Sequence, residues 1–331
     1  MSAFSRLFLP GHQVAIIGYG NQGAAHAQNL RDGGVDVIVG ARAGSADGAR
    51  ARDAGFSVML PNAASVQADM VMIMTPDETH AQVYADHVVP HLRAGKILGF
   101  CHGLAIHFKQ ITPPANVDVI LVSPKVPGYV LRQNFVEGRT SLCLAAVHQD
   151  ASGRAWDIAR GYAAAVSGDA AGVMDSTFED ECVTNLFGEQ AVLCGGIPEI
   201  IKAAFDTLVD AGYPAELAWS ECLNQTKLLV DLIVAGGIKH MREKISNTAE
   251  YGGLVSGPRI VNDAARAEMK KILDEIRSGE FARAWLTENA GGNKNFQKLR
   301  DAEAQHGSEA VGMRMRAMIQ GDMQPHKRKA G

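Results

Sequence analysis

Two short segments in the second half of the chain each place a carboxylate and an amide four residues apart. The first is Asn185-Leu186-Phe187-Gly188-Glu189-Gln190, and the second is Glu221-Cys222-Leu223-Asn224-Gln225. If both are helical, positions i and i+4 lie one above the other, which is the geometry for holding a hard cation between two carboxylates. Each pair here offers one carboxylate and one neutral amide. Whether these pairs bind metal therefore decides which chemistry the chain performs.

Further polar residues follow short apolar runs in the first half of the chain. They are the segment Thr75-Pro76-Asp77-Glu78, His102 and Lys125. Open α/β sheets bind their ligands at the carboxyl ends of such strands. A lysine near a nicotinamide can hold a carboxylate or polarise a carbonyl, and a histidine can relay a proton. Taken singly, each residue has a second interpretation without a role in chemistry: His102 as an ordinary loop histidine, and Lys125 as a surface lysine.

A glycine-rich segment near the start of the chain predicts a dinucleotide site. Gly18-Tyr19-Gly20-Asn21-Gln22-Gly23 matches the pattern G-x-G-x-x-G, follows the apolar run Val14–Ile17 and leads into a helical stretch, Ala24–Leu30. In that setting the glycines allow a tight turn and a close approach of backbone to a pyrophosphate, which the helix N-terminus attracts. A glycine turn that binds no nucleotide is the alternative.

The end of the second predicted strand bears on the type of coenzyme. Arg42 stands near the position where an acid would select NAD(H), and Ser45 follows it, so both favour the 2′-phosphate of NADP(H). Asp47 opposes this because its carboxylate would repel that phosphate. Arg42 also fits a plain surface arginine. The sequence thus predicts a nicotinamide coenzyme and leaves its phosphate state open.

The order of the elements predicts the fold. Short apolar runs alternate with helical stretches in the first half, which indicates βαβ units and a Rossmann-type, doubly wound parallel sheet of the α/β class. After about Gly172 the strand-like runs stop, and residues 178–320 show successive helical patterns. We expect a nucleotide-binding domain over 1–177, an all-α dimerising domain over 178–324 and a basic tail over 325–331. The expected strands are Val14–Gly18, Val35–Val39, Met70–Met74, Lys96–Phe100 and Val117–Val122. The expected helix breaks are Gly195-Gly196, Gly212-Tyr213-Pro214, Gly236-Gly237 and Gly252-Gly253.

Composition narrows the class of protein. The net charge of the 331 residues is −4, and there is no long basic face, which argues against nucleic acid as a partner. The five cysteines are odd in number and form no Cys-x-x-Cys pair, which predicts reduced thiols. No apolar run reaches the roughly 18 residues of a membrane span, and no signal peptide is evident. These features predict a cytoplasmic protein with a small-molecule substrate.

Several of these segments together resemble one family, the ketol-acid reductoisomerases of the short, class I type. The resemblance runs in register from about Gly11 to Met318, and its longest blocks are Leu186–Gly196 and Ser246–Gly252. The other matching segments are Gly18–Gly23, Thr75–Glu78, His102-Gly103 and Pro124-Lys125.

The resemblance implies a specific reaction and a specific site. Members bind NADPH on a Rossmann domain and two magnesium ions on a knotted helical domain, and they form dimers with intertwined helical domains. They convert 2-acetolactate or 2-aceto-2-hydroxybutyrate to dihydroxy acids on the valine and isoleucine route, by an alkyl migration followed by hydride transfer. The implied metal ligands fall at positions 185, 189, 221 and 225, and Ser246 is the implied contact of the substrate hydroxyl. The residues expected at the coenzyme are Gly18, Tyr19, Gly20, Asn21, Gln22, Gly23, Arg42, Ser45, Asp47, Thr75, Pro76, Asp77, His102 and Gly128.

The chain departs from the family pattern where metal would bind. The family has an aspartate where this chain has Asn185 and a glutamate where it has Gln225. The remaining pair, Glu189 and Glu221, offers a charge of −2 against the +4 of two magnesium ions, so two ions are not expected. Further changes of the family pattern are Asn224, Val126, Tyr129 and Asp47.

These departures lead to a hypothesis with two alternatives. The main expectation is an NAD(P)H-dependent reductase of a small 2-keto acid or imine that lost the isomerase step. Its catalytic residues would be His102, Lys125, Glu189, Glu221 and Ser246. The first alternative is an authentic magnesium-dependent ketol-acid reductoisomerase, and the second is a non-catalytic nicotinamide-binding protein.

Overall fold

The computed structural model describes residues 12–320, and the chain divides into two compact units between Asn185 and Leu186. The first unit is built on a β-sheet, and the described part of the second unit consists of helices. The helix α9 (Phe178–Gly188) begins just after the predicted domain boundary and runs through the division between the units. The predicted basic tail, 325–331, lies outside the described residues.

An eight-stranded sheet forms the centre of the first unit, in the order β3-β2-β1-β4-β5-β6-β7-β8. Strands β1 to β6 are parallel, β7 runs antiparallel to β6, and β8 is parallel to β7. The chain order reverses between β1 and β4, which is where open α/β sheets leave a crevice for a ligand. The strands are β1 (Gln13–Ile17), β2 (Asp36–Gly40), β3 (Ser57–Met59), β4 (Met70–Ile73), β5 (Ile97–Phe100), β6 (Asp118–Pro124), β7 (Cys143–Gln149) and β8 (Val173–Asp175).

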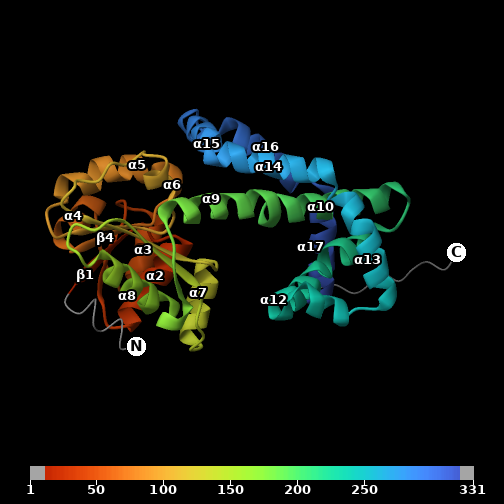
Figure 1. Ribbon diagram of the computed structural model, residues 1–331, viewed down its shortest axis with the longest axis horizontal. Coiled ribbons are helices and arrows are strands. Elements are labelled where there is room, and N and C mark those ends of the chain that lie inside the picture. The colour runs from red at the N-terminus through yellow and green to blue at the C-terminus, as the bar shows by residue number, and fades with distance from the viewer. Residues whose placement is uncertain (1–11, 321–331) are drawn as a thin grey trace. The chain divides into compact units, whose positions relative to one another are not determined.

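Helices cover both faces of the sheet because its central strands are apolar on both sides. Every residue of β4 and β5 is buried, as expected for strands in a parallel sheet. One hydrophobic core includes Leu30 and Tyr162 from helices on one face, and the other includes Ala64 and Ile106 from helices on the opposite face. Figure 1 shows α2, α7 and α8 on one side and α4, α5 and α6 on the other. These helices are α2 (Asn21–Asp32), α3 (Ala46–Asp53), α4 (Pro61–Gln67), α5 (His80–Val83), α6 (Leu104–His107), α7 (Gly128–Val136) and α8 (Ala155–Ser167).

The five expected strands are present, with ends that differ by no more than about two residues from the prediction. Three strands lie outside the prediction: β3, β7 and β8. The expectation that strands stop near Gly172 is wrong, because β8 follows that residue directly. This strand has three residues, two of them exposed, so it carries no alternating pattern and is held by backbone pairing with β7.

The glycine-rich segment forms the turn from β1 into α2. Gly18 has a positive φ of 101°, and a side chain on Gly23 would place its Cβ 2.3 Å from the carbonyl oxygen of Gly18. Both positions therefore require glycine for the turn and for close packing of helix on strand. Around Gly20, by contrast, a Cβ would meet no atom within 4 Å, so the backbone is open at this point.

A second helix starts against the first turn of α2. A Cβ on Gly128, the first residue of α7, would lie 2.1 Å from the carbonyl oxygen of Asn21. The side-chain amide of Gln22 donates a hydrogen bond of 2.9 Å to the carbonyl oxygen of Val126. The loop after β6 is thereby fixed to the glycine-rich turn, and both helices begin at the same edge of the sheet.

The second unit confirms the helical prediction but not every predicted break. Gly252 and Gly253 lie inside α13, so the break expected there is wrong. At Gly253 the helix packs closely on Arg242: a Cβ added at this glycine would lie 2.6 Å from the arginine side chain. The glycine therefore allows close packing and does not break the helix. Gly237 does interrupt α12, with a φ of 85°. The elements are η5 (Glu189–Leu193), α10 (Gly196–Asp210), α11 (Ala215–Trp219), η6 (Ser220–Asn224), α12 (Thr226–Glu243), α13 (Asn247–Ile260), α14 (Asp263–Arg277), α15 (Glu280–Ala290), α16 (Lys294–Ala304) and α17 (Gly307–Ile319).

Within 12–320, no helix combines the length and the apolar composition that a membrane crossing requires.

The packing of α7 on α2 gives a first prediction. Substitution Gly128→Ala should lower the free energy of unfolding by about 1–3 kcal/mol, because the added methyl overlaps the Asn21 carbonyl and the two helices must separate. Chemical denaturation measures this change. The control is Gly188→Ala in α9, where a Cβ meets no atom within 4 Å and stability should stay the same or rise slightly. Equal stability of Gly128→Ala and the wild type would contradict the packing described.

Candidate active site

Three neighbouring strands deliver the polar residues that the sequence singled out in the first unit. Thr75 follows β4, His102 follows β5, and Lys125 follows β6. These strands are adjacent and parallel, so their carboxyl ends meet at one edge of the sheet. The structure therefore brings His102 and Lys125 together, as the strand-end argument expects.

The residue that joins them is Glu181 of α9, which the sequence argument did not select. Its Oε2 accepts hydrogen bonds from the backbone N–H of Gly103 at 2.9 Å and from the ring of His102, with Nδ1 at 3.0 Å. Its Oε1 accepts from Ser123 Oγ at 2.9 Å and from Lys125 Nζ at 2.8 Å. The side chain of Glu181 is 1% exposed, so these four donors replace its water.

The charges in this cluster stabilise one another. Burial alone would raise the pKa of the Glu181 carboxyl, but the hydrogen bond from His102 and the charges of His102 and Lys125 lower it to about 2. Burial would likewise lower the pKa of His102, yet its hydrogen bonds to Cys182 and Glu181 hold that pKa well above the ordinary value. With His102 and Lys125 positive and Glu181 negative, the cluster carries a net charge of +1.

Such a cluster can bind an anion and donate protons. Lys125 is 26% exposed, so its ammonium is anchored by Glu181 on one side and accessible on the other. A cation in this position can hold a carboxylate or stabilise the oxygen of a carbonyl as charge develops on it. The hydrogen bonds that raise the pKa of His102 favour its protonated form, which can supply a proton.

A signal for Glu181 was present in the sequence. It precedes Asn185 by four residues, so it lies on the same helix face one turn earlier. Its role depends on how α9 packs over the strand ends. The sequence pattern does not contain that packing.

The glycine-rich end of the unit has the form of a dinucleotide site. The N-terminus of α2 begins at Asn21, next to the open backbone at Gly20. A pyrophosphate requires such open backbone and a helix N-terminus, so the residues present fit a nicotinamide dinucleotide. On the neighbouring strand Thr75, Pro76 and Asp77 follow β4, and the Thr75 hydroxyl oxygen accepts from Thr79 Oγ1 at 2.9 Å.

The residues after β2 make local contacts. Ser45 uses its hydroxyl locally: it donates to the carbonyl oxygen of Arg42 at 2.8 Å and accepts from the Gly48 N–H at 3.2 Å, which caps α3. The Ser45 hydroxyl is thus engaged at the start of α3, and its contact with a coenzyme phosphate stays a prediction. Arg42 is exposed, and Asp47 pairs with Arg50 at 2.9 Å.

The two carboxylate–amide pairs lie on helices that change their winding at the pair. Asn185 is in α9, and at Glu189 the helix continues as a π-turn, with the Cys194 N–H donating to the Glu189 carbonyl at 2.7 Å. Glu221 also lies in a π-turn, η6. The simple α-helical geometry that we expected is therefore modified at both pairs. Single π-turns of this kind often occur at functional sites.

The two side chains of the second pair are hydrogen-bonded to each other. Gln225 Nε2 donates to Glu221 Oε2 at 2.6 Å. The amide therefore occupies, with a hydrogen-bond donor, the carboxylate oxygen that would ligate a metal. Among the described residues of this single chain, no group of three or more His, Cys, Asp or Glu side chains could hold a metal ion. The neutral amides and the bonded Glu221 do not fit a pair of magnesium ions. Ser246, the expected substrate contact, caps α13 by accepting from the Ala249 N–H at 3.2 Å.

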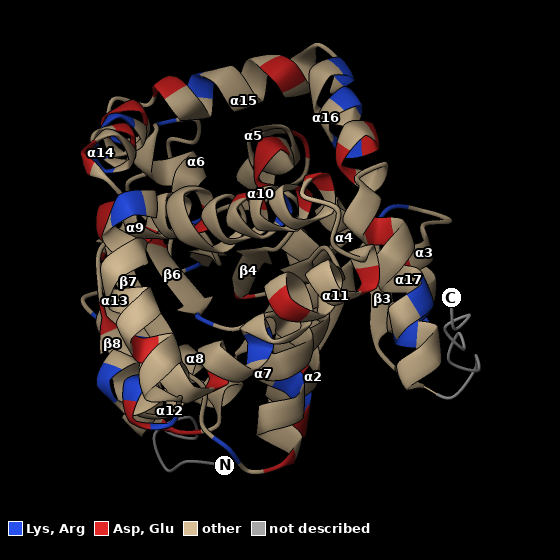
Figure 2. Ribbon diagram, turned by 90° about the vertical axis from the view of Figure 1, so that its right-hand side faces the viewer, with Lys and Arg blue, Asp and Glu red and all other residues tan. Residues whose placement is uncertain are grey.

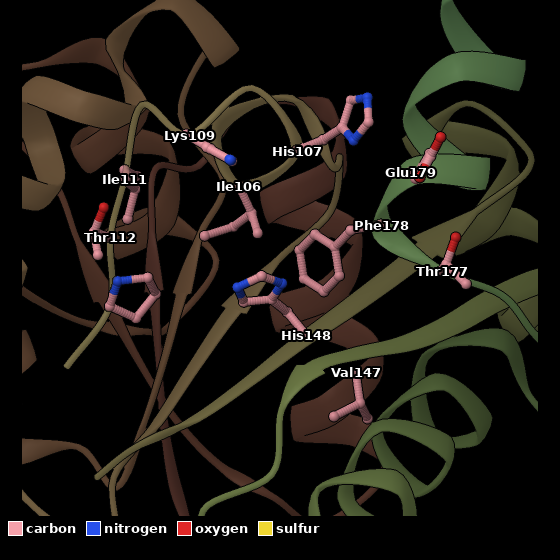
Figure 3. Close-up of a pocket in the computed structure, with 11 residues that line it drawn as sticks. Ile106, His107, Lys109, Ile111, Thr112, Val147, His148, Thr177, Phe178 and Glu179 are labelled. Atoms are coloured by element: carbon pink, nitrogen blue, oxygen red, sulfur yellow. The ribbon is translucent and has the colours of Figure 1, made fainter. Parts of the chain in front are cut away.

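A separate pocket of about 540 Å³ lies at the start of α9 and contains none of the predicted site residues. Figure 3 shows Phe178 and His148 side by side in its wall, and their ring centroids are 5.7 Å apart. Lys109, Thr112 and Glu179 are exposed parts of its lining. The pocket thus belongs to the surface that supports α9 and is distinct from the Glu181 cluster.

Two family models together match most of the chain. The family model described as acetohydroxy acid isomeroreductase, NADPH-binding domain, matches residues 8–172, and that described as ketol-acid reductoisomerase, C-terminal domain, matches residues 178–321. The structure of an NADH-preferring ketol-acid reductoisomerase from an uncultured archean is 41% identical, with a TM-score of 0.90, over 93% of this chain and 95% of that one.

More distant structures share the fold alone. A semialdehyde dehydrogenase NAD-binding protein from Cupriavidus necator is 18% identical, with a TM-score of 0.62, over 81% of this chain and 99% of that one. Pyrroline carboxylate reductase from Plasmodium falciparum is 12% identical, with a TM-score of 0.52, over 81% and 98%.

The Glu181 cluster gives the second prediction. Substitution Glu181→Gln keeps the shape but leaves His102 and Lys125 without their shared anion, so the free energy of unfolding at pH 7 should fall by about 2–4 kcal/mol. The pKa of His102 should fall as well, because burial then dominates. Denaturation and an NMR titration of the histidine ring measure the two effects. The control is Glu179→Gln, an exposed position on the same helix, which should change stability by less than about 0.5 kcal/mol.

The pH dependence of stability has a definite sign. Glu181 stabilises the wild type above the carboxyl pKa of the unfolded chain, and this contribution is lost as pH falls through about 2. His102 stabilises it below the histidine pKa of the unfolded chain, and this contribution is lost as pH rises through the raised pKa. Both contributions should shrink in Glu181→Gln. An unchanged pH profile would show that the cluster does not stabilise the fold.

Proposed function

Because the chain belongs to the ketol-acid reductoisomerase family, we propose that this NAD(P)H-dependent oxidoreductase reduces the keto group of a small 2-keto acid. The observation that carries the proposal is the cluster in which Glu181 holds both His102 and Lys125 at the carboxyl ends of β5 and β6. The cluster supplies a positive charge and a proton donor beside the edge where α2 begins. Those are the requirements of carbonyl reduction that a protein must meet.

The residues have separate tasks in this reaction. The coenzyme, held by the glycine-rich turn and the N-terminus of α2, supplies the hydride. Lys125 would bind the substrate carboxylate or the keto oxygen, and its Nζ is kept in place by Glu181 and by Ser123 Oγ at 3.0 Å. His102 would deliver the proton that the new alkoxide takes up. Glu181 touches both residues and would act by positioning them and by keeping them charged.

Two forms of this function differ in the step before reduction. Resemblance over nearly the whole chain supports the complete isomeroreductase reaction on 2-acetolactate better than it supports the narrower one. The narrower form, reduction of a 2-keto acid or imine without alkyl migration, is supported by the amides Asn185 and Gln225 and by the hydrogen bond that joins Gln225 to Glu221. We favour the narrower form because alkyl migration in the family depends on two cations, and the donor set here does not fit them.

A non-catalytic coenzyme-binding protein is a third form. The buried ionic cluster argues against it. The side chain of Glu181 is only 1% exposed, so the carboxylate stays charged only because all of its hydrogen-bond donors are present. A site without chemistry has no physical need for such a group.

One assay separates these forms. Oxidation of NADH and NADPH is followed with 2-acetolactate, with its isomerised ketone 3-hydroxy-3-methyl-2-ketobutyrate, and with a cyclic imine, each with magnesium and with EDTA. Turnover of the ketone or the imine in EDTA supports the narrower form. Magnesium-dependent turnover of 2-acetolactate by the wild type at about 1 per second or faster would contradict it and establish the complete reaction. Coenzyme binding without any turnover would indicate a sensor.

The amides provide the third prediction. The double substitution Asn185→Asp with Gln225→Glu restores two carboxylates, so magnesium affinity should rise by at least about tenfold, because each added charge strengthens the site electrostatically. Isothermal titration calorimetry measures the affinity, and 2-acetolactate turnover should become detectable only with magnesium. The control adds the same charges on α16 with Asn295→Asp and Gln297→Glu, at exposed positions. Tight magnesium binding by the wild type would refute the loss of the site.

We also propose that the protein is a cytoplasmic homodimer. Large apolar side chains are exposed on α12 and α13, including Val234 at 82%, Ile238 at 64% and Tyr251 at 73%. Figure 2 shows few charged residues along α13, whereas charges are frequent on α14. Apolar surface of this kind marks protein–protein contact, and a second copy of the chain would cover it. All five cysteines are free thiols, which suits a reducing compartment.

The proposed dimer gives the fourth prediction. Substitution Val234→Glu should shift the protein from dimer to monomer, because it would bury an unpaired carboxylate between the subunits. Size-exclusion chromatography with light scattering measures the mass. The control is Val66→Glu on α4, a valine with 49% exposure in the first unit, which should leave the mass unchanged. A monomeric wild type would contradict the proposal.

A further inference from the structure

The pocket at the start of α9 has the size and the lining of a small-molecule site. Its volume is about 540 Å³, and its apolar lining includes Ile106, Ile111 and Phe178, which are 4%, 3% and 5% exposed. The His148 ring lies edge-on to the Phe178 ring, with an interplanar angle of 67°. Sites for small organic molecules are concave and mostly apolar, with volumes of about 300–1,000 Å³, and they contain a few polar groups that orient the ligand.

Lys109 supplies a positive charge to this pocket from an unusual backbone conformation. Its φ is 55°, in the left-handed region that favours glycine. The N–H of Lys109 donates to the Ile106 carbonyl at 3.1 Å, and the N–H of Gln110 donates to the Ala105 carbonyl at 2.9 Å. This pair of bonds ends α6 on a left-handed residue, which in such helix ends is most often glycine. Backbone preference therefore does not account for a lysine at this position.

The Lys109 ammonium is available to a ligand. Within the described range 12–320, no hydrogen bond or ion pair engages its Nζ, and the residue is exposed. Figure 3 shows Lys109 and Glu179 on opposite sides of the pocket. A carboxylate at Lys109 is thus attracted, whereas a second negative group that reaches toward Glu179 is repelled. The imidazole of His107, also in the lining, offers a further hydrogen-bonding group.

We propose that this pocket binds a small organic monocarboxylate with an aromatic body. The carboxylate would pair with Lys109, and the aromatic part would pack against the rings of Phe178 and His148. The pocket shares no lining residue with the Glu181 cluster, so binding here does not depend on the proposed reaction. The ligand would nevertheless contact α9, because Phe178 and Glu179 form the first turn of the helix that carries Glu181.

Isothermal titration calorimetry of the full-length protein with 2-naphthoate tests this proposal. The neutral 2-naphthamide and the dianion naphthalene-2,6-dicarboxylate should each bind at least about fivefold more weakly, because the first lacks a charge for Lys109 and the second brings a charge toward Glu179. Lys109→Gln should raise the Kd for 2-naphthoate by about fivefold or more. The matched control is Lys298→Gln on α16, an exposed lysine, which should change this Kd by less than about twofold.

The substitution Lys109→Gly separates ligand binding from folding. Glycine adopts a φ of 55° without strain, so the midpoint of thermal unfolding should rise by about 1–3 °C while 2-naphthoate binds as weakly as it does to Lys109→Gln. Absence of 2-naphthoate binding at millimolar concentration would overturn the proposal, as would equal Kd values for the wild type and Lys109→Gln. Weaker binding in Lys125→Gln with unchanged binding in Lys109→Gln would assign the carboxylate to the Glu181 cluster and overturn it too.

Discussion

One buried carboxylate organises the active end of the first unit. Glu181 reaches the sheet from α9 and is stable as an anion only because His102, Gly103, Ser123 and Lys125 all donate to it. These donors come from the ends of two neighbouring strands, so the carboxylate fixes a helix to the sheet and two cations to each other. If one donor is lost, a buried charge is left short of partners, which is costly. The position of α9 and the charge of the site therefore depend on the same group.

The predictable part of the fold is the part that burial dictates. β1, β2, β4, β5 and β6 are apolar runs enclosed by helices, and such runs are visible in a sequence. β7 and β8 extend the sheet beyond β6 with reversed direction. The first four residues of β7 are buried, so burial supports this strand too, whereas the short β8 is held by backbone pairing with β7. The breaks at glycines show the same limit. Gly237 bends its helix, whereas Gly253 only permits a close approach to Arg242, and one residue type serves both purposes.

Only the site residues that directly follow strands could be predicted from the sequence. His102 and Lys125 follow from the rule that parallel strands gather their ligands at one edge. Glu181 does not, because its role requires α9 to lie across that edge. Ser45 shows a contact that its residue type alone does not reveal: its hydroxyl bonds to the Arg42 carbonyl and caps α3. In each case a side chain's function is decided by which partner is nearest in space, and sequence spacing limits that choice only within one element.

Under the proposed function, the Glu181 cluster and the Glu221–Gln225 pair are stabilised separately. His102, Lys125 and Glu181 belong to the first unit, whereas Glu221 and Gln225 belong to the second. Replacing a carboxylate by an amide at position 225 alters charge locally, and the new hydrogen bond to Glu221 satisfies what remains. Nothing in that exchange disturbs the donors around Glu181. The proposed reduction is therefore compatible with a loss of charge at position 225, because the two groups of charge depend on different partners.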